Sequence, residues 1–132
     1  MKVLQITHHA YPCIGGIENF VLNLSKNLNK NGIHSEILCL NKCPNSNRVL
    51  PAKSIVEGVK IQRIPFYNFK YYKIAPKLLN KLKHFDILHV HNIGFFSDFL
   101  ALTKKLHGKP LILNTHGGIF HTKQNSITKK FY

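Results

Sequence analysis

Short apolar runs alternate along the chain with longer segments of mixed polarity. The runs are rich in β-branched residues and too short for ordinary helices, so they predict buried strands. The third run is the second arm of a hairpin that we expect over residues 54–64, with its turn at Glu57 and Gly58. The predicted strands cover residues 2–7, 35–41, 59–64, 86–92 and 110–118.

The segments between these strands place apolar side chains three or four residues apart, which is the spacing of one helical face. Asn31 with Gly32, and Gly108 with Pro110, are typical signals for the end of a helix. Residues 42–58 are instead rich in turn-forming residues and predict a loop before the hairpin. The predicted helices cover residues 17–30, 76–84 and 95–106, and another begins within residues 126–132.

Strands that alternate with helices, each an almost continuous apolar run, indicate a parallel sheet covered on both faces. Right-handed crossovers then favour a doubly wound, Rossmann-like α/β fold with the strand order 3-2-1-4-5. In this topology ligands bind beyond the C-terminal ends of the strands, where the order reverses. We therefore expect loops 8–16, 92–95 and 115–121 to line one crevice.

The composition fits one globular domain, because 132 residues with 44% apolar content are enough to build a core. A spanning helix and a signal peptide are not predicted, which favours a cytoplasmic location. The cysteines, Cys13, Cys39 and Cys43, are odd in number and are not spaced like structural zinc ligands. We therefore expect free thiols rather than a metal site.

The net charge of the chain favours anionic partners. The chain has 19 Lys and Arg against 5 Asp and Glu, a formal net charge of +14, so much of its surface carries a positive potential. Nucleic acid, a phospholipid surface and phosphorylated small molecules are all anionic enough to bind it. No known nucleic-acid recognition motif occurs in the sequence, which disfavours the first of these.

A glycine pair, Gly15 and Gly16, stands where the first strand turns into the first helix. Such a turn lets the backbone approach a ligand and leaves the first helical N–H groups free for an anion. A tight turn that needs a positive φ explains the pair equally well. Glu18, in the first turn of the helix, complements the helix dipole with or without a ligand. The G-x-G-x-x-G motif and an acidic end to the second strand are missing, which disfavours a dinucleotide dehydrogenase.

Histidines also fall in the predicted crevice. His116 follows the fifth strand and has Gly117 and Gly118 behind it, where it could bond to a bound sugar or transfer a proton. His8 and His9 lie at the mouth of the crevice, although an interpretation as ordinary polar loop residues is favoured.

The sequence argues against metal and hydrolytic chemistry. His89 and His91 share one face of a strand, but no third ligand lies at a fixed spacing, so packing or hydrogen bonding is favoured. No Ser or Cys stands in a recognisable nucleophile motif, so a hydrolase is not indicated.

Residues 67–85 interleave aromatic residues with lysines ahead of a helix with one apolar face. A surface of this kind can lie on an anionic membrane, with lysines at the headgroups and aromatic rings at the interface. A core-facing helix with solvated lysines is the alternative. The candidate membrane-surface residues are Lys70, Tyr71, Tyr72, Lys73, Lys77 and Lys81.

Four segments together resemble the N-terminal half of a family 4 glycosyltransferase, an enzyme of the two-domain GT-B architecture. They are GGIENFVLNLSKNLNKNGIHSEILCL, EGVKIQRIP, DILHVHN and PLILNTHGG. Each segment is a loose match by itself, but the four occur in the right order and span nearly the whole chain. The resemblance implies a retaining sugar transferase that uses a nucleotide-sugar as co-substrate and requires no metal or other cofactor.

The resemblance also assigns roles to individual residues. It implies that Gly15, Gly16 and Gly117 contact the phosphates or sugar of the donor, and that His116 acts at the reacting centre. His9 and Asn92 would meet the acceptor. Many members act on lipid-linked acceptors, which agrees with a basic, aromatic membrane surface and a peripheral location on the inner face of the membrane.

The paired glutamates of the family's donor-binding domain have no counterpart in this sequence. We therefore expect residues 1–132 to form a single, truncated, acceptor-side N-terminal domain that lacks the C-terminal donor-binding domain. Such a domain would be inactive alone and would pair with the missing domain or a complementary chain. The alternative is a non-catalytic basic module that docks on an anionic membrane or a partner chain.

Overall fold

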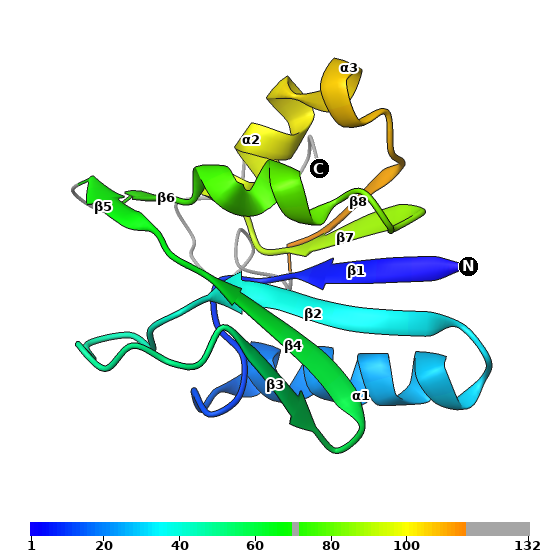
Figure 1. Ribbon diagram of the computed structural model, residues 1–132, viewed down its shortest axis with the longest axis horizontal. Coiled ribbons are helices and arrows are strands. Elements are labelled where there is room, and N and C mark those ends of the chain that lie inside the picture. Colours follow the sequence, from blue (N-terminus) through cyan, green and yellow to red (C-terminus); the bar gives the residue numbers. More distant parts are fainter. Residues whose placement is uncertain (70–71, 116–132) are drawn as a thin grey trace, which may run out of the picture.

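The computed structural model describes residues 1–69 and 72–115, and a sheet of six strands runs through its centre (Figure 1). The strand order is β3-β4-β2-β1-β7-β8. Neighbouring strands are parallel except β3 and β4, which are antiparallel. The strands are β1 (Lys2–Ile6), β2 (His34–Leu40), β3 (Lys53–Val56), β4 (Val59–Ile64), β7 (Ile87–His91) and β8 (Leu111–Asn114).

This arrangement confirms the predicted doubly wound order for the five parallel strands. The additional edge strand β3 is the first arm of the predicted hairpin. Its turn has positive φ at both central residues, 50° at Glu57 and 82° at Gly58, which matches the right-handed twist of the two strands. The fifth strand is shorter than predicted, and its expected continuation from residue 116 lies outside the described residues.

Helices cover both faces of the sheet, as predicted. α1 (Gly16–Lys30) packs on one face, where Val21 shares an apolar core with Ile37 and Ile61. Lys30 in its last turn and Asn31 at its C-cap end the helix, followed by Gly32 with a φ of 84°. The 3-10 helix η1 (Pro76–Lys81) and α2 (Phe95–Leu102) lie on the opposite face (Figure 1). Their core there includes Leu4, Leu38, Leu78, Leu88, Phe96 and Leu100.

Two predicted helices differ from the structure in form. The second is a 3-10 helix that ends before His84, although Leu78 and Leu82 are buried as the pattern indicated. The third is divided at Thr103, whose side-chain hydroxyl donates to the Phe99 carbonyl at 2.7 Å, so α2 is followed by the short helix α3 (Lys104–His107). Side-chain hydroxyls that bond to the preceding turn compete with helix continuation.

The expectation of three free thiols is wrong for two of them. Cys13 and Cys43 form a disulfide across a sequence separation of 30 residues. The pairing escaped sequence analysis because the two loops meet only once β1 and β2 are side by side. Cys39 remains a thiol on β2, and burial raises its pKa to about 12, so it is unreactive.

A second, two-stranded sheet was not predicted. β5 (Tyr67–Phe69) and β6 (Tyr72–Ile74) form an antiparallel hairpin in the basic, aromatic stretch that precedes η1. Because the hairpin is too short for its pattern to be distinguished from a loop, the sequence signal was weak. Within the described ranges no helix is long and apolar enough to cross a membrane.

Candidate active site

The candidate site lies at the carboxyl edge of the two central strands. β1 and β7 are parallel neighbours, with Ile6 opposite Val90, so the turns that follow them leave the sheet side by side. The ring of His8, from the first turn, lies 5.2 Å from the ring of Phe96 at the start of α2. Two of the three loops predicted to line the crevice therefore meet, and the third, 115–121, lies almost entirely outside the described residues.

His8 is packed into the junction between these turns. A Cβ added to Gly94 would lie 2.9 Å from Cε1 of His8, so the close approach of the imidazole requires glycine at that position. Burial, followed by the nearby charges of His9 and Lys73, lowers the pKa of His8 to about 4. His8 is therefore neutral at physiological pH and acts in the site as a packed, polar ring.

His9 is held from two sides by polar groups. Its Nδ1 lies 3.1 Å from the carbonyl oxygen of Lys42, in the loop after β2, and its Nε2 lies 3.4 Å from Nζ of Lys73 on β6. A carbonyl can only accept, so Nδ1 carries the proton and Nε2 accepts from the ammonium group. Burial and Lys73 lower the pKa of His9, whereas the bond to Lys42 raises it. Since the lone pair of Nε2 is engaged, His9 is suited to positioning rather than to proton abstraction.

Asn92 forms the other wall of the junction. It has a φ of 77°, in the left-handed region that non-glycine residues adopt rarely and asparagine tolerates best. Its backbone N–H donates to the carbonyl of Asn114 on β8 at 2.7 Å, so the turn is tied to the neighbouring strand. Uncommon backbone conformations of this kind cluster at functional sites.

The glycine pair begins α1 at the same edge. Gly15 has a φ of 168°, which is extended backbone open to any residue, and Gly16 is not in the left-handed region either. The explanation by a positive φ is therefore wrong. A Cβ at Gly15 would collide with the Glu18 carboxylate, which folds back over the helix start, whereas one at Gly16 would meet nothing within 4 Å. Among the described residues no side chain caps the helix, so space and backbone N–H groups remain at Gly16.

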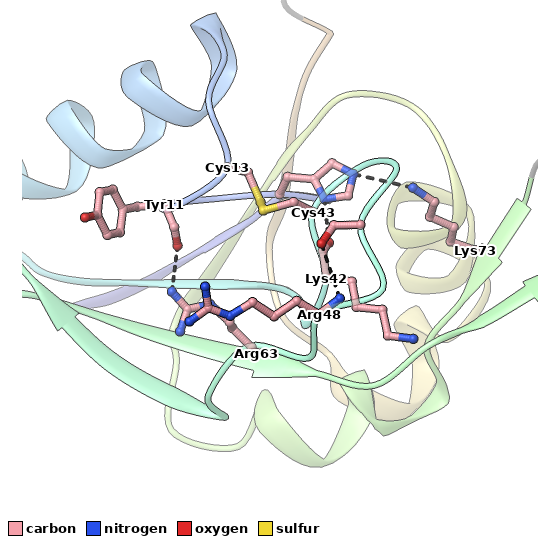
Figure 2. Close-up of a disulfide and its surroundings, with 9 residues drawn as sticks. Tyr11, Cys13, Lys42, Cys43, Arg48, Arg63 and Lys73 are labelled. Atoms are coloured by element: carbon pink, nitrogen blue, oxygen red, sulfur yellow. Dashed lines mark hydrogen bonds between the residues drawn. A yellow bond between two sulfur atoms is a disulfide. The ribbon is translucent and has the colours of Figure 1, made fainter.

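Two contacts that sequence analysis missed hold the first turn in place. The disulfide ties Cys13 to Cys43 in the loop after β2, and Figure 2 shows it beside Tyr11 and Arg63. The guanidinium of Arg63, on β4, donates to the Tyr11 carbonyl at 2.6 Å and to the hydroxyl of Ser54 at 2.6 Å. Arg63 is only 5% exposed. Its burial beside the turn after β1 could not be predicted from the sequence, because it depends on the folded structure.

His89 and His91 lie beneath the site with their rings 4.2 Å apart. His91 donates from Nε2 to Oε1 of Gln5 at 2.7 Å, and both side chains are fully buried. Hydrogen bonds continue from Gln5 to Ser35 and from Ser35 to Ser25 on α1. The hydrogen-bonded interpretation of this strand pair is thus confirmed for His91. Within residues 1–69 and 72–115, no group of three His, Cys, Asp or Glu side chains could hold a metal ion.

The remaining predicted site residues lie in different parts of the chain. Lys73 lies on β6, with its Nζ 3.4 Å from Nε2 of His9, whereas Lys77 and Lys81 belong to η1. Tyr72 falls within β6. The predicted residues outside the described part of the chain are Lys70, Tyr71, His116 and Gly117.

Comparisons with known proteins show the family of the chain. The family model for Glycosyltransferase Family 4 matches residues 14–132. A GDP-mannose:cellobiosyl-diphosphopolyprenol alpha-mannosyltransferase from Xanthomonas campestris is 38% identical over 134 residues, covering 100% of this chain and 35% of the relative. The enzyme of the same name from Komagataeibacter xylinus is 41% identical over 123 residues, covering 92% of this chain and 31% of the relative. The chain thus spans about a third of the length of these relatives, and it belongs to Glycosyltransferase Family 4.

Proposed function

We propose that this chain forms the acceptor-side domain of a retaining hexosyltransferase, which moves a sugar from a nucleotide-sugar donor to a lipid-linked acceptor. The observation that carries the proposal is the meeting of the His8–His9 turn with the Asn92 turn at the carboxyl edge of β1 and β7. The relatives are named for GDP-mannose and a cellobiosyl-diphosphopolyprenol acceptor, so these are the first substrates to test.

The proposed roles follow the geometry of the two turns and, for His116 and Gly117, the family resemblance. The uncapped start of α1 at Gly15 and Gly16 contributes N–H groups to the donor phosphates. His9 and Asn92 contact the acceptor sugar, because both belong to the two turns, where Lys42 holds the His9 ring and Asn114 holds the Asn92 backbone. His116 and Gly117 complete the donor side, with His116 at the reacting centre, and no metal ion takes part.

A second domain supplies the remaining donor contacts in this proposal. The chain spans 35% of the Xanthomonas campestris relative, and the donor-binding half would occupy the remaining length. The 132 residues alone would therefore be inactive.

The test joins this chain to the remaining part of the Xanthomonas campestris relative and measures transfer of labelled mannose from GDP-mannose to the lipid-linked acceptor. We expect transfer by the joined protein, none by the chain alone, and loss of most activity in His116→Ala. Full activity in His116→Ala would remove this residue from the reacting centre. Inversion at the anomeric carbon of the product would contradict the retaining mechanism.

The second candidate is a non-catalytic basic module that docks on an anionic membrane or a partner chain. The observation in its favour is the β5–β6 hairpin, where Tyr67 is 71% exposed and Lys73 lies on the neighbouring strand. Sedimentation with vesicles tests it, since binding should rise with anionic lipid and fall with salt. Binding that depends on neither would exclude this surface as a membrane contact.

A further inference from the structure

Lys73 is a cation beside the turn after β1, and among the described residues it has no acidic partner. All five acidic residues of the chain lie in the described ranges, and the salt bridges found there join Lys26 to Glu57 and His34 to Glu36. The Nζ of Lys73 instead lies 3.4 Å from Nε2 of His9 and 5.8 Å from the centroid of the Phe66 ring. Neither a neutral imidazole nor an aromatic ring neutralises its charge.

The backbone fixes the position of this ammonium group indirectly, through the ring of His9. The carbonyl of Lys42 orients the His9 ring, and the ring in turn accepts one N–H of Lys73. An ammonium group has three N–H donors, and within the described part of the chain only His9 accepts one, so two remain for a ligand. Because His8 and His9 are neutral near pH 7, Lys73 carries the charge among these three residues.

We propose that Lys73, oriented by His9, binds a diphosphate group of a substrate beside the turn after β1. This inference rests on the proposed function, because a diphosphate occurs both in a nucleotide-sugar donor and in a diphosphate-linked lipid acceptor. An ammonium group is a strong partner for phosphate oxygens, and one already held in place loses less side-chain entropy when it binds. His9 is a positioning residue in this arrangement, and Lys73 contacts the substrate.

The first test titrates the chain with inorganic pyrophosphate at constant ionic strength and follows binding by calorimetry and by the NMR signals of His9. We expect Lys73→Gln to weaken binding about tenfold, the loss typical of one charge-assisted hydrogen bond. Lys77→Gln is the matched control, because it removes the same charge from an exposed position four residues further on and should change binding less than twofold. Pyrophosphate should also raise the pKa of His9 in the wild-type chain but not in Lys73→Gln.

Variants at His9 separate positioning from simple charge. His9→Ala keeps the charge of Lys73 but removes the ring that accepts its hydrogen bond, so pyrophosphate binding should weaken by roughly threefold to tenfold. His9→Gln can still accept a hydrogen bond and should recover part of the loss. Wild-type binding in both variants would remove His9 from the proposal. Absence of pyrophosphate binding by the wild-type chain, or equal binding by Lys73→Gln, would overturn the proposal for Lys73.

Two further probes identify the source of the diphosphate. GDP represents the donor, and farnesyl diphosphate represents a lipid diphosphate that is soluble enough to titrate. The probe whose affinity falls in Lys73→Gln identifies the source, and unchanged affinity for both overturns the proposal. None of these measurements requires transfer activity. A joined protein without transferase activity would count against the proposed function, whereas the pyrophosphate titration would still decide the role of Lys73.

Discussion

The turns after β1 and β7 lie side by side at one edge of the sheet and each leads through a glycine into a helix, yet they are held in different ways. The first is held by residues distant in sequence, namely the Cys13–Cys43 disulfide and the bond from Arg63 to Tyr11. At the second turn Asn92 also bonds to Asn114 on β8, but the helix start is held by nearby groups, since Ser97 accepts from the N–H of Gly94 and donates to its carbonyl, both at 3.0 Å. The β1 turn therefore depends on the completed fold, whereas the helix start after β7 is encoded locally.

The disulfide provides the largest test of this difference. Replacing Cys13 and Cys43 together by serine should lower the free energy of unfolding by about 3 kcal/mol, because the bond closes a long loop in the unfolded chain. Chemical denaturation measures the loss. A reductant should bring the wild-type protein to the stability of the double variant and leave that variant unchanged. Insensitivity of the wild-type protein to reductant would contradict the assignment.

Acid should destabilise the β1 turn through His8. The pKa of His8 is about 4 in the folded chain and about 6.5 when unfolded, so the unfolded state binds more protons between these values. Stability from this group is complete above pH 6.5 and is lost as the pH falls towards 4, by about 2 kcal/mol after allowance for partial exposure.

Denaturation at several pH values, compared between the wild-type chain and His8→Gln, measures this contribution. The variant should show a shallower loss of stability between pH 6.5 and 4. A His8 resonance that titrates near its ordinary pKa would rule out the packed, neutral ring.

The contact between the two turns is tested at Gly94. Gly94→Ala would place a Cβ 2.9 Å from Cε1 of His8, so we expect a loss of about 1–2 kcal/mol as the ring shifts. In a His8→Ala background the same substitution should cost much less, because nothing remains to collide with. Equal costs in the two backgrounds would show that the turns do not touch at this point.

Gly16→Ala has the smallest expected effect on stability. It tests whether glycine is needed at this position for donor binding rather than for folding. A Cβ there meets nothing within 4 Å, so stability should stay level or rise by about 0.5 kcal/mol. Transfer activity of the joined protein should nevertheless fall if donor phosphates approach this backbone. Unchanged activity would leave Gly16 without a functional role.

Much of the fold could be predicted because its signals are local. The strand order followed from alternating apolar runs and right-handed crossovers, and the turn at Glu57 and Gly58 followed from one glycine between two β-like segments. The predicted type of the second helix was wrong, since the three-residue spacings from Ala75 to Leu78 and from Leu79 to Leu82 fit a 3-10 helix as well as an α-helix. Of the candidate site, the positions of His9 and Asn92 were predictable from the rule that ligands bind at the carboxyl edge.

The sequence by itself thus indicated the family, the strand order and the edge of the sheet where the candidate site lies, because these depend on patterns within segments, on the order of those segments and on general rules of chain connection. Only the tertiary structure decided that Cys13 pairs with Cys43, that Arg63 supports Tyr11 and that Lys73 meets His9. These partners are separated by 30, 52 and 64 residues. No local pattern connects them, and they become neighbours only when parallel strands bring their ends to a common edge.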